Sequence, residues 1–110
     1  MILPITAHAV QELLARGDVE VIDVREAHEW ATGHIAGARR VALNELRNNP
    51  QAALLRDSVV FVCAAGVRSE TAARIAVAHG LTRVYNMTSG MRGWVRAGLP
   101  VALPELAAAV

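Results

Sequence analysis

The sequence contains little of several residue types. Its 110 residues include one cysteine, one phenylalanine and one tyrosine, and all 11 basic residues are arginine, so lysine is absent. A single cysteine cannot form a disulfide within the chain, which suits a reducing compartment. A formal net charge of +1 with few aromatic rings provides no surface typical of nucleic-acid binding. These scarcities predict a cytoplasmic protein that does not bind nucleic acid.

Long apolar runs are absent as well. No stretch approaches the roughly 20 apolar residues that cross a bilayer, so no membrane partner is expected. The start, M-I-L-P-I-T-A-H, lacks the basic and apolar regions of a secretory signal. The spacing between the cysteine and the four histidines does not match a metal site, so no bound metal is predicted.

The composition is that of a globular domain, with 54% hydrophobic and 19% charged residues. No repeat, low-complexity tract or linker divides the chain, so we expect one domain over residues 1–110. The segments V-E-V-I (residues 19–22) and V-V-F-V (residues 59–62) predict buried strands. Weaker strand candidates are residues 3–5, 40–43 and 83–86.

Helical patterns lie between these strand candidates. Thr6 is a predicted N-cap for a helix that ends at Gly17. Further helices are predicted over residues 26–32, 44–55, 69–79 and 90–97, with a short one after Pro104. Alternating strands and helices favour an α/β fold with a mainly parallel sheet.

Residues 58–75 read S-V-V-F-V-C-A-A-G-V-R-S-E-T-A-A-R-I and place Cys63 directly after a strand candidate. In open α/β sheets, sites form beyond the carboxyl ends of the strands. Gly66 allows the chain to curl tightly, and the helix that begins near Arg68 or Ser69 leaves its first N–H groups free. Such converging N–H groups attract an anion and lower the pKa of a thiol. Cys63 is therefore a candidate nucleophile, and the alternative is a small buried side chain.

The length of the loop distinguishes two chemistries. Cysteine-dependent phosphate chemistry needs five residues between the cysteine and an arginine, whereas four residues separate Cys63 from Arg68. The smaller ring suits one terminal sulfur on Cys63, which would form a persulfide. Arg68 adds a permanent positive charge and a planar fork of donors.

Three motifs in this order resemble the single-domain form of the rhodanese family. They are I-D-V-R-E-A-H-E-W-A-T-G-H-I-A-G-A (residues 22–38), C-A-A-G-V-R (63–68) and V-Y-N-M-T-S-G-M-R-G-W followed by G-L-P-V (84–101). The resemblance implies a three-layer fold, in which helices flank a five-stranded, mainly parallel sheet. It also implies transfer of sulfane sulfur through a Cys63 persulfide, from a donor such as thiosulfate to cyanide or a thiol.

The loop and the resemblance together define the predicted site. Cys63 is the predicted catalytic residue, and neither a cofactor nor a metal is implied. The expected partners are a small-molecule sulfur donor and a thiophilic acceptor, which includes a protein thiol. The predicted substrate-binding residues form the rest of the loop: Ala64, Ala65, Gly66, Val67, Arg68 and Ser69.

Two other functions remain open from the sequence. One is a non-catalytic rhodanese-like interaction module, against which the joint presence of Cys63, Gly66 and Arg68 argues. The other is a phosphatase or arsenate reductase, which the loop length disfavours.

Structural roles are predicted for several other residues of the three motifs. Asp23 and Arg25 are expected to form a buried ion pair, and His34 is expected to bond the backbone around the turn at residues 33–38. The expected core side chains are Trp30, Trp94, Met87 and Met91.

Overall fold

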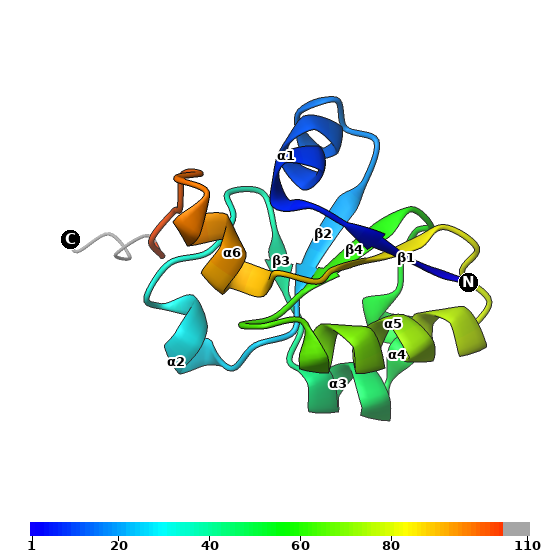
Figure 1. Cartoon of the computed structure of the whole chain (residues 1–110). Helices are drawn as coiled ribbons and strands as arrows, with labels where there is room; N and C mark the ends of the chain where they lie inside the picture. Colours follow the sequence, from blue (N-terminus) through cyan, green and yellow to red (C-terminus); the bar gives the residue numbers. More distant parts are fainter. Residues whose placement is uncertain (105–110) are drawn as a thin grey trace.

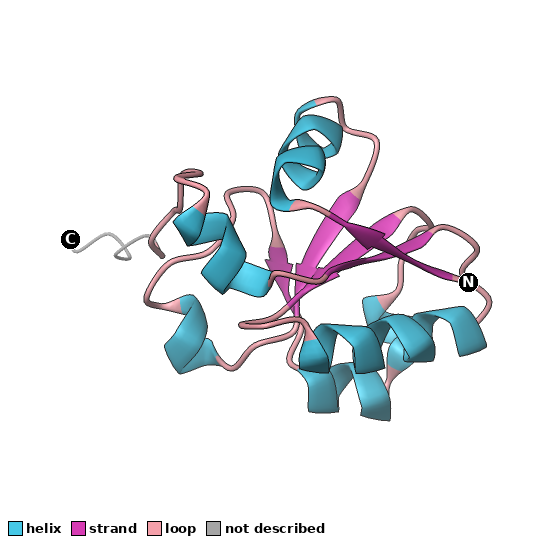
Figure 2. Ribbon diagram, viewed as in Figure 1, coloured by secondary structure: helices cyan, strands magenta, loops and turns pink. Residues whose placement is uncertain are grey.

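The computed structural model describes residues 1–104 and contains a central sheet between two layers of helices (Figure 1; Figure 2). All strand pairs are parallel, and the strand order is β1-β5-β4-β2-β3. The expected three-layer α/β fold is therefore confirmed. The strands are β1 (Ile2–Ile5), β2 (Glu20–Asp23), β3 (Arg39–Arg40), β4 (Val59–Val62) and β5 (Val84–Met87).

The helices divide between the two faces of the sheet. Helices α1 and α6 cover one face, and α3, α4 and α5 cover the other (Figure 1). No helix within residues 1–104 has the length and apolarity needed to cross a membrane. The helices are α1 (Ala7–Ala15), α2 (Ala27–Trp30), α3 (Leu43–Asn48), α4 (Pro50–Ala53), α5 (Val67–Ala78) and α6 (Gly90–Arg96). The short helix expected after Pro104 lies outside the described residues.

Strand β4 lies in the middle of the sheet and is buried on both faces. Val59 and Phe61 pack beneath α3, α4 and α5, whereas Val60 and Val62 pack toward α1 and α6. All four side chains are fully buried, and each contributes roughly 1.5–3 kcal/mol of hydrophobic stabilisation. The continuous apolar run in the sequence reflects this burial on two faces. Because β4 is rigidly packed, the residue that follows it is held in a defined place.

Two predicted elements differ from the structure around the third strand. Residues 40–43 were expected to form a strand, but β3 has only two residues and Leu43 already begins α3. Residues 44–55 were expected to form one helix, but the chain breaks at Asn49, whose φ is −148° and ψ is 69°. The break has a local cause, because Pro50 disfavours the helical conformation of the residue before it.

Helix α2 is shorter than predicted and leaves Trp30 half-buried at the edge of the molecule. The expectation that Trp30 belongs to the core is therefore wrong. Its ring stacks on the His34 ring instead, with centroids 3.5 Å apart. Stacking covers one apolar face of each ring, although neither ring belongs to the two groups of buried residues that form the core. The His34 ring also bonds the backbone, but before the turn where that bond was expected: Nδ1 lies 3.3 Å from the Trp30 carbonyl oxygen, to which the Nδ1–H tautomer donates.

Thr6, Trp94, Met87 and Met91 take the structural roles expected for them. Thr6 caps α1, because its hydroxyl oxygen accepts a hydrogen bond from the Ala9 N–H at 3.2 Å. Trp94 is almost fully buried, and its indole N–H donates to the Pro100 carbonyl at 2.8 Å. Met87 and Met91 are buried in the same core cluster as Trp94.

Candidate active site

Cys63 lies at the carboxyl end of the central strand, at the edge of the sheet where β2 and β5 also end. It is 1% exposed and packs in the core cluster beneath α5. Helix α5 begins at Val67, two residues earlier than predicted, directly after Gly66. The turn from strand to helix is therefore confined to the residues between Cys63 and Gly66, which confirms the tight loop expected there.

The carbonyl groups of this loop are turned away from the sulfur. The Cys63 carbonyl accepts from the Met91 N–H at 2.8 Å, and the Ala64 carbonyl accepts from the Arg92 N–H at 3.1 Å. Both donors are free N–H groups in the first turn of α6. Because its carbonyl oxygens bond outward, the loop can turn backbone N–H groups inward, toward the thiol.

Gly66 is required at the closest approach of the loop to β5. Its φ of +90° lies in the left-handed region, and a Cβ there would overlap the Thr88 carbonyl. The Gly66 N–H donates to Cys63 Sγ at 3.1 Å, and the Gly66 carbonyl accepts from Asn86 Nδ2 at 3.2 Å. The glycine thus presents its N–H to the sulfur while Asn86 holds its carbonyl.

The polar surroundings of Cys63 favour its thiolate. Burial raises the pKa of the Cys63 thiol, but hydrogen bonds to the sulfur outweigh that effect and leave the pKa below its ordinary value. The donors are the Ser69 hydroxyl and the backbone N–H groups of Ser69, Ala65 and Gly66. The lowered pKa agrees in direction with the sequence prediction.

Ser69 connects the sulfur to a buried amide. Its Oγ lies 3.3 Å from Cys63 Sγ and donates to Asn86 Oδ1 at 2.6 Å. A hydroxyl has one proton, so it cannot donate to both groups at once. While Cys63 is a thiol, its S–H can donate to Ser69 and Ser69 can donate to Asn86. When Cys63 ionises, the Ser69 proton must turn to the sulfur to stabilise it.

We expect Ser69→Ala to raise the pKa of Cys63, because a donor to the thiolate is lost. The thiolate is the reactive form, so at a given pH below that pKa the variant contains less of it. The measurement is the rate of alkylation by iodoacetamide as a function of pH. Ser69→Thr is the control, since it keeps a hydroxyl. An alkylation midpoint in Ser69→Ala that is unchanged or lower would contradict this role.

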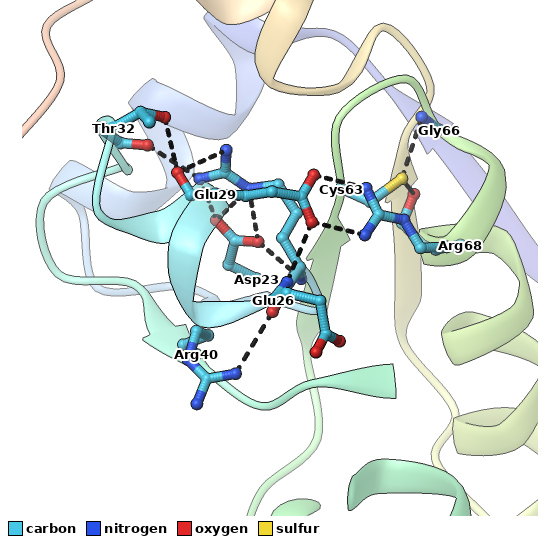
Figure 3. A network of polar contacts seen from close by, with 11 residues as sticks. Asp23, Glu26, Glu29, Thr32, Arg40, Cys63, Gly66 and Arg68 are labelled. Atoms are coloured by element: carbon cyan, nitrogen blue, oxygen red, sulfur yellow. Dashed lines mark hydrogen bonds and ion pairs between the residues drawn. The ribbon is translucent and has the colours of Figure 1, made fainter. Parts of the chain in front are cut away.

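The guanidinium of Arg68 is present beside the loop, but its donor fork is occupied. Arg68 Nη1 and Nη2 donate to Glu29 Oε1 and Oε2 at 2.8 and 2.9 Å (Figure 3). The hydrogen bond from Arg68 lowers the pKa of Glu29 to about 2, while Glu29 raises the pKa of Arg68. The stabilisation from this pair is therefore present above the usual Glu pKa of 4.5 and is lost as the pH falls toward 2.

Behind Glu29 lies the buried ion pair that the sequence predicts. Arg25 Nη2 is 2.8 Å from Asp23 Oδ2, and both side chains are buried. Arg25 also donates to the Gly33 carbonyl at 2.8 Å and to the Glu29 carbonyl at 3.4 Å. The structural role expected for Asp23 and Arg25 is confirmed, since the pair ties the end of β2 to α2 and the turn after it.

The predicted substrate-binding residues differ in how they face the sulfur. Gly66 and Ala65 face Sγ with their backbone N–H groups, and Ser69 faces it with both its N–H and its hydroxyl. The side chain of Val67 is directed to solvent, and the whole residue is 75% exposed. Among residues 1–104, no cluster of three or more His, Cys, Asp or Glu side chains could hold a metal ion.

The sequence did not predict the roles of two polar residues in the site, Glu29 and Asn86. A signal existed for each: Glu29 lies within the first motif, and Asn86 is an amide inside an apolar strand pattern. Neither signal identifies a partner, because Glu29 is 39 residues from Arg68 and Asn86 is 17 residues from Ser69.

The parallel sheet with a cysteine loop between its central strand and the following helix defines a class of α/β domain. Comparison with known families assigns the chain within that class. It matches the family described as Rhodanese-like domain over residues 6–97, and the chain therefore belongs to the rhodanese-like domain family.

Relatives and solved structures agree with this assignment. The chain is 36% identical over 75 residues to YqhL of Bacillus subtilis strain 168, which covers 68% of this chain and 60% of that protein. It is 32% identical over 91 residues to thiosulfate sulfurtransferase GlpE of Stutzerimonas stutzeri strain A1501, covering 83% of this chain and 80% of GlpE. A rhodanese-related protein from Thermoplasma volcanium superposes with a TM-score of 0.81 at 29% identity, covering 93% of this chain and 99% of that one.

Proposed function

We propose that this protein is a sulfurtransferase in which Cys63 carries the transferred sulfur as a persulfide. The observation that carries the proposal is a buried thiol at the end of β4 whose sulfur receives the Gly66 N–H at 3.1 Å and lies 3.3 Å from Ser69 Oγ, surroundings that lower its pKa. The similarity to a thiosulfate sulfurtransferase at 32% identity supports the same reaction class. A free thiol used in this way must stay reduced, so a cytoplasmic location is part of the proposal.

The first half-reaction loads sulfur onto the enzyme. The Cys63 thiolate attacks the outer sulfur of thiosulfate, the Sγ–S bond forms, and the S–S bond of the donor breaks. Sulfite leaves with the electron pair of that bond, and the persulfide keeps the single negative charge of the thiolate. The inward N–H groups of the loop stabilise this charge as it moves to the terminal sulfur.

The second half-reaction returns the enzyme to its starting state. Cyanide or a thiolate attacks the terminal sulfur, takes it as thiocyanate or as a new persulfide, and releases the Cys63 thiolate. Because the donor product leaves before the acceptor reacts, ping-pong kinetics are expected.

Intact mass spectrometry of the wild-type protein tests this function. After incubation with thiosulfate, the protein should be heavier by one sulfur atom, and cyanide should remove that mass and form thiocyanate. A protein that gains no mass from thiosulfate or from any other sulfane-sulfur donor would instead be a non-catalytic interaction module. Hydrolysis of an aryl phosphate by the unloaded protein would favour the phosphatase alternative, which the four-residue spacing disfavours.

A further inference from the structure

The ion pair between Glu29 and Arg68 joins α2 to the first turn of α5 beside the cysteine loop (Figure 3). It is bidentate and partly exposed, with 35% of the Arg68 side chain and 23% of the Glu29 side chain accessible. A bidentate carboxylate uses the same parallel donors that a guanidinium would offer to a sulfonate or sulfate-like group. A donor anion must therefore compete with Glu29 for Arg68.

The charges of this ion pair and of the ion pair beside it cancel. Arg68 is the only charged side chain in the segment 63–69, and Glu29 matches it. Arg25 and Asp23 form a second matched pair next to Glu29, whose backbone carbonyl accepts from Arg25 Nη1 at 3.4 Å. These two carboxylates and two guanidinium groups have no net charge, so they provide no excess positive potential for a doubly charged donor.

A backbone N–H at the start of its own helix also holds the carboxylate of Glu29. Glu29 Oε1 accepts from the backbone N–H of Glu26 at 3.1 Å, which fixes it at the start of α2 independently of Arg68. A glutamine at this position keeps an oxygen for the same N–H while losing the negative charge. The charge of Glu29 can thus be removed with the anchoring hydrogen bond retained.

We propose that Glu29 is a specificity-determining residue that, by occupying the Arg68 guanidinium, disfavours doubly charged sulfur donors relative to singly charged ones. The donor class that the site favours is a sulfane-sulfur monoanion, such as the persulfide anion R–S–S⁻ of an otherwise uncharged thiol. Sulfur loading then balances as the Cys63 thiolate plus R–S–S⁻ giving the Cys63 persulfide anion plus the thiolate of R. This inference rests on the sulfurtransferase function proposed above.

Two donors that differ by one charge test the proposal. Thiosulfate is a dianion, and methanethiosulfonate is a monoanion that delivers the same outer sulfur and releases methanesulfinate. In Glu29→Gln we expect kcat/KM for thiosulfate to rise about fivefold at low ionic strength, the size expected for one partly exposed ion pair. The rise for methanethiosulfonate should be less than half as large. Added salt should reduce both gains.

Glu20→Gln is the matched control. Glu20 pairs with Arg39 at 3.0 Å, with 34% of the Arg39 and 20% of the Glu20 side chain accessible, at the opposite end of β2 from the site. This control loses an equally exposed ion pair and should leave the preference between the two donors unchanged. A second variant, Arg68→Gln, leaves Glu29 uncompensated and should shift the preference toward methanethiosulfonate.

The outcomes separate the role of Glu29 from the proposed function. If both donors load Cys63 by intact mass but Glu29→Gln and Arg68→Gln change the two kcat/KM values by equal factors, Glu29 has no part in selectivity and this inference is overturned. Opposite shifts of the preference in the two variants support it. If neither these two donors nor any other sulfane-sulfur donor loads the wild-type protein, the proposed function fails and the inference fails with it.

Discussion

Cys63→Ser should abolish both the gain of a sulfur atom from thiosulfate and the formation of thiocyanate. A serine hydroxyl stays protonated at neutral pH, and the N–H groups that favour a thiolate cannot ionise it. We expect the rate to fall by about 10⁴-fold or more, the scale seen when an enzyme loses its nucleophile. The measurements are intact mass after incubation with the donor and steady-state assay of thiocyanate.

The fold should survive this substitution. The hydroxyl is close in size to the thiol, and Ser69 and Gly66 remain as hydrogen-bond partners. Thermal unfolding followed by circular dichroism is the control, and it should show the cooperative transition of the wild-type protein. A well-folded Cys63→Ser protein that still gains sulfur and forms thiocyanate would exclude Cys63 as the sulfur carrier.

Gly90→Ala should disrupt the site without altering any group that contacts the sulfur. Gly90 has a φ of +64°, and an alanine Cβ there would overlap the Ala64 carbonyl and lie 2.6 Å from the Ala65 nitrogen. The loop must move to relieve the overlap, which would weaken the hydrogen bonds from α6 to the Cys63 and Ala64 carbonyls. A displacement of about 1 Å at a reacting group can cost about 100-fold in rate, which is the loss expected in kcat/KM for thiosulfate.

Gly98→Ala separates this overlap from backbone strain. Gly98 has a similar φ of +75°, but a Cβ there would meet no atom within 4 Å. Both variants should lose about 1–2 kcal/mol of stability from the left-handed conformation, and only Gly90→Ala should also lose sulfur transfer. Equal activities in the two variants would show that the packing of α6 on the loop does not position Cys63.

Local patterns were sufficient to predict most of the fold. Strand β4 follows from four consecutive apolar residues, and α1 follows from the Thr6 cap, because burial and capping act over a few neighbouring residues. Pro50 is also a local signal, because a proline disfavours the helical conformation of the residue before it. It explains why the helix expected over residues 44–55 is divided into two. Trp30 shows the limit of such patterns. Its place at the end of a short helix does not determine whether other parts of the chain cover its side chain.

The sequence by itself determined the α/β fold, the position of Cys63 directly after a strand, and the tight loop at Gly66. Each depends on torsions and burial of adjacent residues. The tertiary structure alone decided that Glu29 occupies Arg68, that Asn86 bonds both Ser69 and the Gly66 carbonyl, and that α6 holds the loop. These contacts join segments 17 to 39 residues apart. Polar side chains find such partners only after the sheet has brought the ends of its strands together, because a hydrogen bond needs a partner within about 3 Å and the sequence does not specify that distance.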